Sequence, residues 1–137
     1  MIFERNKLVR FAHCDPAGIV FYPRYAELLN EIIEDWFAEG LGVGFQQLMS
    51  EYHLAVPVVQ LCCDFFAPAR LGELLSFRLQ VNELGKSSVQ LVIEIVRGER
   101  VCVQARLKLV LVSIDDFRAV AMDDFWRSKF IAFQSAT

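Results

Sequence analysis

A carboxylate in a turn rich in proline and glycine, followed at once by the start of a helix, is the feature of this sequence best suited to chemistry. The segment reads Asp15-Pro16-Ala17-Gly18-Ile19-Val20-Phe21-Tyr22-Pro23-Arg24-Tyr25. A helix start presents unpaired backbone N–H groups and the positive end of the helix dipole. A carboxylate held beside them could attack a carbonyl carbon, or direct water onto it, while those N–H groups bind the carbonyl oxygen. Acyl transfer by this route needs no Ser-His-Asp triad.

The same residues also have an ordinary structural interpretation. Asp-Pro and Pro-Ala-Gly are common turn sequences, in which an aspartate bonds to its own backbone. Two features favour the chemical interpretation. The turn leads directly into a helix, and the large aromatic side chains of Phe21, Tyr22 and Tyr25 would suit an apolar acyl pocket.

The elements that would position Asp15 follow from the hydrophobic pattern. Residues 2–11 are predicted to form a strand before the turn. From Pro23 to about Glu39, apolar residues recur at the three-and-four spacing of one helix face; they are Tyr25, Leu28, Leu29, Ile32, Ile33, Trp36 and Phe37. Pro23 suits the first helical position and Gly40 suits the end.

The remainder of the chain is predicted to be mostly strand. The expected strands are Val56–Ala69, Glu73–Glu83, Ser87–Val96, Arg100–Ile114 and a short run at Phe117–Met122. Gly85-Lys86 and Gly98-Glu99 are expected to be two-residue hairpin turns. Short helices are expected near Phe45–Glu51 and from Asp123 to about Phe133. This order predicts a single α+β domain over residues 1–137, with one long helix against a curled antiparallel sheet.

The composition favours an oligomer. Of 137 residues, 55% are hydrophobic and 12 are phenylalanine, more than a lone globule of this size would easily bury. Runs such as 109–112 place apolar groups on both faces of the sheet, so we expect the second face to meet another subunit or apolar layer. A dimer formed by sheet extension, with further face-to-face association, would account for the surplus.

Other partners and compartments are disfavoured. No stretch approaches the ~18 uncharged apolar residues that a membrane helix needs, and the N-terminus lacks a signal-peptide pattern. The net charge of −3, without a basic block, argues against nucleic acid. The four cysteines show no CxxC spacing, which fits reduced thiols in a cytoplasmic protein. His13-Cys14-Asp15 is too compact to wrap a zinc ion, so no metal site is expected.

Residues 15–25 resemble the signature of the 4-hydroxybenzoyl-CoA thioesterase family of hotdog-fold enzymes, and the element order agrees over nearly the whole chain. The resemblance implies a long central helix wrapped by a five- to six-stranded antiparallel sheet, in dimers often paired into tetramers. It implies that Asp15 is the nucleophile or the base toward water, and that a backbone N–H near Tyr22 polarises the thioester carbonyl. Gly18, Phe21 and Tyr25 would contact substrate, and Lys86 would be the remnant of a basic cluster that binds CoA phosphates.

The resulting hypothesis is an acyl-CoA thioesterase that hydrolyses an aromatic, benzoyl-type, or short- to medium-chain acyl-CoA to the acid and CoA, without a cofactor. Two alternatives stay open: a hotdog hydratase or dehydratase, and a non-catalytic acyl-CoA or acyl-carrier binding protein. Among other polar residues, Arg97 and Arg100 could contact phosphates, although solvation is the commoner role of such side chains. Arg106 and Lys108 could line a groove or face solvent, and His53 and Asp64 are weaker candidates for the pocket.

Overall fold

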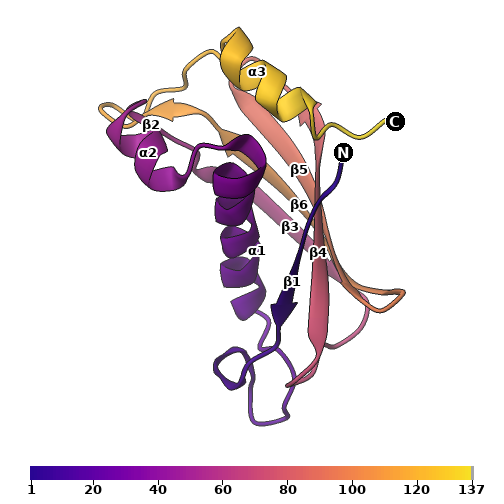
Figure 1. Cartoon of the computed structure of the whole chain (residues 1–137). Coiled ribbons are helices and arrows are strands. Elements are labelled where there is room, and N and C mark those ends of the chain that lie inside the picture. Colours follow the sequence, from indigo (N-terminus) through magenta and orange to yellow (C-terminus); the bar gives the residue numbers. More distant parts are fainter. Residues whose placement is uncertain (137) are drawn as a thin grey trace.

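The computed structural model describes residues 1–136. The chain folds into a curved antiparallel sheet with a long helix against its inner face (Figure 1). The sheet has the strand order β1-β4-β5-β6-β3. Its strands are β1 (Phe3–Leu8), β3 (Val58–Phe65), β4 (Leu74–Leu84), β5 (Ser88–Arg97) and β6 (Arg100–Val110). A small second sheet pairs β2 (Leu54–Ala55) with β7 (Val112–Ser113). The helices are η1 (Phe11–His13), α1 (Arg24–Asp35), η2 (Trp36–Leu41), α2 (Phe45–Ser50) and α3 (Asp124–Ile131).

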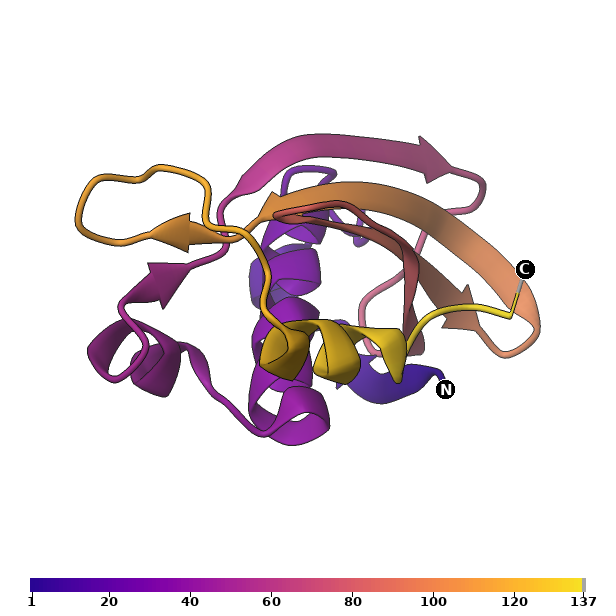
Figure 2. The ribbon, with the colours of Figure 1, turned by 90° about the horizontal axis from the view of Figure 1, so that it is seen from above.

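Helix α1 lies in the concavity of the sheet, as the view from above shows (Figure 2). The apolar face predicted from the sequence is buried: Tyr25, Leu28, Leu29, Ile32 and Ile33 are each at most 4% exposed. These side chains join one continuous core with the inward-facing residues of β4, β5 and β6. The expected α+β arrangement, a hotdog fold with a five-stranded sheet, is confirmed. None of the described helices is long and apolar enough to cross a membrane.

The outer face of the sheet is more polar than the sequence suggested. Side chains alternate along most of the long strands, apart from bulges at Val81/Glu83 and Ile95/Val96. The outward positions carry Arg78, Gln80 and Asn82 on β4, Gln90, Val92 and Glu94 on β5, and Gln104, Arg106 and Lys108 on β6. The expectation that apolar runs would make both faces apolar is therefore wrong for the centre of the sheet. Several of the exposed apolar side chains lie instead along β3 and just before α1, while others lie at the N-terminus and on α2 and α3.

The end of the long helix also differs from the prediction. Gly40 was expected to end the helix. Instead, the helix continues as a wider turn, η2, through Leu41, and it is capped by Gly42, whose φ of 80° lies in the left-handed region. Gly42 has the conformational freedom that a helix end needs. Gly40 is required for another reason: a Cβ there would lie 2.7 Å from Trp36 Cδ1 and 3.2 Å from the rings of Phe3 and Phe133.

Gly40→Ala should lower the free energy of unfolding by about 1–3 kcal/mol, because an added methyl group overpacks a core that holds Trp36 fully buried. Alanine's better helix propensity, worth up to ~1 kcal/mol, offsets part of the loss. Denaturant unfolding measures the change. Gly44→Ala is the control, since its Cβ would make an ordinary contact of 3.7 Å with Ala38. Equal stability of the two variants would contradict the overpacking argument.

Three smaller predictions have mixed outcomes. The Gly98-Glu99 hairpin is confirmed, with Gly98 at φ 60° between paired Arg97 and Arg100. At the other hairpin the turn lies one residue later than predicted, because the Gly85 N–H donates to Ser88 O and Gly85 does not have positive φ. The run 117–122 is not a strand and makes only a single bridge, between Ala119 and Val112. Its direction is set by hydrogen bonds from Val120 to Leu111 and from Met122 to Lys86.

Candidate active site

The turn that carries Asp15 folds back on itself before the chain enters α1. Cys14 and Val20 pair as an antiparallel bridge, and the Asp15 N–H donates to Ile19 O at 3.0 Å. Gly18, with φ 77°, donates its N–H to Asp15 O at 3.0 Å. A left-handed residue is needed to close so short a loop, which explains the glycine. The Phe21 N–H then donates to His13 O at 2.9 Å, which holds the approach to the helix beside the aspartate.

The Asp15 side chain is half-buried, and only one of its two carboxylate oxygens accepts a hydrogen bond from the described residues. Its Oδ1 accepts the Ala17 N–H at 2.8 Å, the Asx-type turn bond of the ordinary interpretation. Within residues 1–136 the carboxylate accepts no other hydrogen bond. The turn bond fixes the direction of the carboxylate, and the second oxygen keeps its lone pairs for a reacting group. The structural and chemical interpretations of Asp15 are therefore compatible.

The start of α1 provides the expected free donor. The Arg24 N–H donates to Phe21 O at 2.8 Å and the Tyr25 N–H donates to Tyr22 O at 3.2 Å, so both are used within the first turn. Pro23 has no N–H. In the described part of the chain, no hydrogen bond uses the Tyr22 N–H. It is thus a donor at the positive end of the α1 dipole, available to an oxyanion.

An apolar hollow of about 340 Å³ adjoins this donor. Its lining residues come from the turn, the start of α1 and the end of β3; they are Ile19, Val20, Tyr22, Tyr25, Phe65, Phe66, Ala67 and Pro68. The rings of Tyr25 and Phe65 lie 5.4 Å apart, and the exposed rings of Phe21 and Tyr22 meet edge to face at the same separation. A hollow of this size and lining can hold an aromatic or short aliphatic acyl group.

Tyr25 lines this hollow from below, and only 4% of the residue is exposed. Burial raises the pKa of its phenol, nearby Cys102 raises that pKa further, and a hydrogen bond with the Ala69 backbone acts in the opposite direction. The phenol therefore stays neutral at physiological pH. Its position suits a packing and orienting role in the pocket rather than proton transfer.

Five of the predicted site residues lie near one another in the chain, and two of these, Tyr22 and Tyr25, line the hollow, whereas Lys86 lies far from them. Asp15, Gly18, Phe21, Tyr22 and Tyr25 lie on one continuous segment. Lys86 lies in the β4–β5 turn, at the opposite end of the sheet (Figure 1). Since β4 has 11 residues, the two ends are roughly 35 Å apart within one subunit.

The other candidates are also placed away from the hollow. His53 is exposed beside the small β2–β7 sheet, at the same end as Lys86. Asp64 lies opposite Gln104 of β6 and shares its outward face. His13, which directly precedes the Asp15 turn, is half-buried, and its Nδ1 accepts the Arg10 N–H at 2.9 Å.

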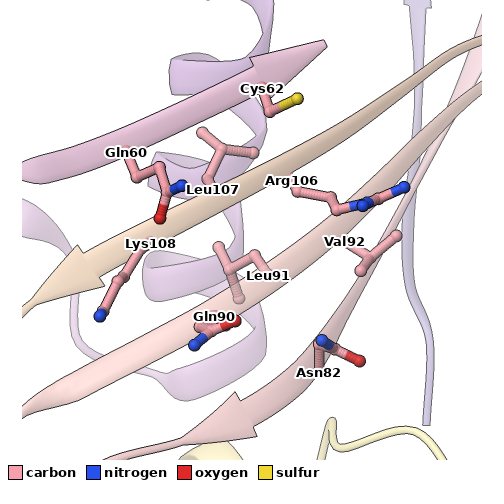
Figure 3. Close-up of a pocket in the computed structure, with 9 residues that line it drawn as sticks. All are labelled: Gln60, Cys62, Asn82, Gln90, Leu91, Val92, Arg106, Leu107 and Lys108. Atoms are coloured by element: carbon pink, nitrogen blue, oxygen red, sulfur yellow. The ribbon is translucent and has the colours of Figure 1, made fainter. Parts of the chain in front are cut away.

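Arg106 and Lys108 lie on the outer face of the sheet. With Gln60, Cys62, Asn82 and Gln90 they surround a hollow of about 200 Å³, whose other lining residues are Leu91, Val92 and Leu107 (Figure 3). Polar and apolar residues share its lining, and none of them belongs to the Asp15 turn or to helix α1. Among the described residues, no group of three or more His, Cys, Asp and Glu side chains could hold a metal ion.

Sequence reasoning missed the residues at the end of β3 and directly after it. Phe65, Phe66, Ala67 and Pro68 form the far wall of the hollow, although they are more than 40 positions from Tyr22 in the chain. The available signal was two adjacent aromatics followed by a proline at a strand end. Arg97 and Arg100 were weighed as phosphate ligands, yet both side chains donate to backbone carbonyls of this wall.

Comparisons with known proteins agree with this geometry. Residues 9–130 match the family model described as the thioesterase-like superfamily. A 1,4-dihydroxy-2-naphthoyl-CoA hydrolase of Synechocystis sp. is 24% identical over 128 residues, covering 92% of each chain. The protein of the same name from Thermosynechococcus vestitus is 30% identical over 102 residues, covering 73% of this chain and 69% of its own. The solved structure of a gentisyl-coenzyme A thioesterase superposes with a TM-score of 0.82 at 26% identity, covering 94% of this chain and 99% of that one.

Proposed function

Since the chain belongs to the thioesterase-like superfamily and is a thioester hydrolase, we propose that it hydrolyses an aromatic acyl-CoA with Asp15 as its reactive carboxylate. The observation that supports this most is the combination of a half-engaged Asp15 carboxylate, an unused Tyr22 N–H at the start of α1, and an aromatic-lined hollow that Tyr22 borders.

In the proposed reaction, the acyl group enters the hollow and its carbonyl oxygen accepts the Tyr22 N–H. Asp15 then attacks the carbonyl carbon, or removes a proton from a water molecule that does so. The N–H and the α1 dipole stabilise the negative charge that develops on the oxygen. The C–S bond breaks and CoA leaves as a thiolate. Where Asp15 itself attacks, the acyl group is then held as an anhydride, and a water molecule cleaves that anhydride to release the acid and restore the carboxylate. A thioester suits a single carboxylate, because its carbonyl is weakly resonance-stabilised and thiolate is a good leaving group.

The aromatic preference rests on the hollow and on the relatives. Phe65 and Tyr25 present ring faces and edges at its base, and Phe21 and Tyr22 extend the aromatic surface at its mouth. The named activities of the relatives concern aromatic acyl groups joined to CoA. A flat ring would bury its faces against these side chains, and an offset or edge-to-face ring contact adds roughly 0.5–1.5 kcal/mol beyond area burial.

We further propose that the working unit is a dimer formed through the free edge of β3. That edge leaves backbone N–H and C=O groups unpaired, and Val59, Leu61 and Phe65 beside it are exposed. Antiparallel pairing about a two-fold axis reverses the partner's sheet, which places its β4–β5 turn at the Asp15 end of this chain. Lys86 of the partner subunit could then reach the phosphates of the bound CoA. Pairing of dimers into tetramers and a cytoplasmic location belong to the same proposal.

The two alternatives make different demands on the site. A hydratase or dehydratase would need a histidine with a carboxylate at the substrate's double bond, and His13 already uses Nδ1 within the turn. A binding protein would keep the hollow but show no turnover.

A thiol-release assay with benzoyl-CoA, phenylacetyl-CoA, 1,4-dihydroxy-2-naphthoyl-CoA and hexanoyl-CoA tests the proposal. We expect kcat/KM for the aromatic thioesters to exceed that for hexanoyl-CoA by at least about tenfold, which corresponds to ~1.4 kcal/mol. Higher activity on hexanoyl-CoA would contradict the aromatic preference. Tight binding of all four without release of CoA would favour the binding protein.

A further inference from the structure

Two arginines at the β5–β6 hairpin hold the wall of the hollow from outside. Arg97 Nη1 donates to Pro68 O at 2.8 Å, and Arg100 Nη2 donates to Phe66 O at 3.3 Å. These carbonyls belong to residues 66–73, the connection between β3 and β4, which we call the wall segment. A connecting segment has no neighbouring strand whose N–H groups could donate to its carbonyls. The guanidinium groups therefore donate these hydrogen bonds instead.

A carboxylate at the end of the wall segment completes the contact. Glu73 Oε1 accepts the Arg70 N–H at 2.5 Å and lies 3.4 Å from Arg97 Nη1. The side chains of Arg97 and Glu73 are 33% and 28% exposed, so the pair is partly shielded from water. Arg97 and Glu73 together therefore determine where Pro68 and Arg70 lie.

The wall segment in turn holds the Asp15 turn from both sides. On the C-terminal side of the Asp15 turn, the Val20 N–H donates to Ala69 O at 2.9 Å and the Leu71 N–H donates to Gly18 O at 3.0 Å. On its N-terminal side, the Gly72 N–H donates to Val9 O at 2.9 Å, and the Val9 N–H donates to Glu73 O at 2.8 Å. A displacement of the wall segment would thus move the pocket wall and the reactive carboxylate together.

We propose that Arg97, through its contacts with Glu73 and Pro68, is a positioning residue for Asp15. This inference rests on the proposed role of Asp15. Arg97 touches neither the hollow nor the reacting atoms, so its effect must pass through the wall segment. Displacement of a reacting group by about 1 Å can lower the rate by roughly 10²-fold.

Kinetics of Arg97→Gln, Glu73→Gln and the double variant test this role. We expect each single variant to lose about 10²-fold in kcat with a smaller change in KM, and the double variant to lose little more than either single one, because all three disconnect the same contact. Arg97→Lys should retain intermediate activity, since a lysine keeps the charge but reaches only one of the two acceptors. Arg78→Gln is the matched control: it breaks a 2.9 Å ion pair with Glu4 on the outer face and should leave kcat unchanged.

A truncated substrate separates positioning from phosphate binding. The same variants are assayed on the N-acetylcysteamine thioester of the acyl group preferred by the wild type, which lacks the nucleotide and its phosphates. The kcat loss should persist. A rise in KM alone on acyl-CoA, absent with the truncated thioester, would show that Arg97 binds a phosphate and would overturn the proposal.

Amide hydrogen exchange tests the same contacts without reference to activity. In Arg97→Gln and Glu73→Gln, we expect the Val20 and Leu71 amides to exchange at least about tenfold faster, while the Ile93 amide in the centre of β5 is unchanged. Unchanged protection of Val20 and Leu71 would overturn the positioning role. If the wild type hydrolyses no thioester but these amides lose protection, the positioning of the turn stands and the proposed function fails.

Discussion

Asp15→Asn should lower kcat for acyl-CoA hydrolysis by about 10³-fold or more while leaving substrate affinity within a few-fold of the wild type. The amide has nearly the same size and keeps an oxygen that can accept the Ala17 N–H, so the turn should remain intact. It is a far weaker nucleophile and base than a carboxylate, so either form of the proposed reaction is lost. A change confined to the chemical step lowers kcat and kcat/KM together.

The measurement pairs thiol release with binding of a non-hydrolysable acyl-CoA thioether by calorimetry. Ala17→Ser is a suitable control, because it alters the same turn but retains the Ala17-position N–H and the carboxylate. Activity of Asp15→Asn close to that of the wild type would remove Asp15 from the mechanism. Loss of binding together with activity would instead show that the aspartate mainly maintains the turn.

Leu61→Lys should convert the β3-edge dimer into monomers, raising the dimer dissociation constant by about 10²–10³-fold. Leu61 is 46% exposed on the inner side of β3, where it borders an apolar hollow of about 180 Å³ with Ala26, Leu29 and Ile33. In a dimer paired through β3, this side chain lies within the interface. A buried ammonium group without a partner costs roughly 3–4 kcal/mol, and each 1.4 kcal/mol is a tenfold change.

Light scattering and sedimentation over a range of concentrations measure the effect. Gln80→Lys is the matched control, since it adds the same charge to the outer face of β4, away from the β3 edge. We expect Leu61→Lys to lose hydrolysis of acyl-CoA as well, because Lys86 is too far from Asp15 within one subunit to bind the same substrate. An unchanged molar mass would exclude β3 as the contact, and a fully active monomer would exclude a role for the partner's Lys86.

The parts of the fold that were predictable depend on neighbours in sequence. The apolar spacing in α1 requires only that one face of the helix be buried, and the alternation in β4 and β6 requires only that one face of the sheet be covered. Asp15, Gly18 and Tyr22 lie within eight residues, so one turn and one helix start suffice to place them. The family suggested by those residues is confirmed by the match over residues 9–130.

Other features depended on packing between distant segments. Gly40 and Gly42 are identical in type, but Trp36 crowds the first and the backbone conformation requires the second. The apolar surplus indicated an exposed interface, but only the alternation of the folded sheet showed that it lies along β3 and not across the outer face. A shift of one residue in the pairing register of a strand would have exchanged its two faces.

The sequence by itself determined the Asp15 turn, the helix that follows it and the kind of sheet that covers that helix, because each arises from contacts or periodicities within a short window. Only the tertiary structure decided that Phe65 and Phe66 complete the hollow, that Arg97 and Glu73 support the Asp15 turn, and that Lys86 lies at the other end of the sheet. These relations join residues dozens of positions apart. They follow from strand order and register, which depend on the burial of the whole core and cannot be derived from a single segment.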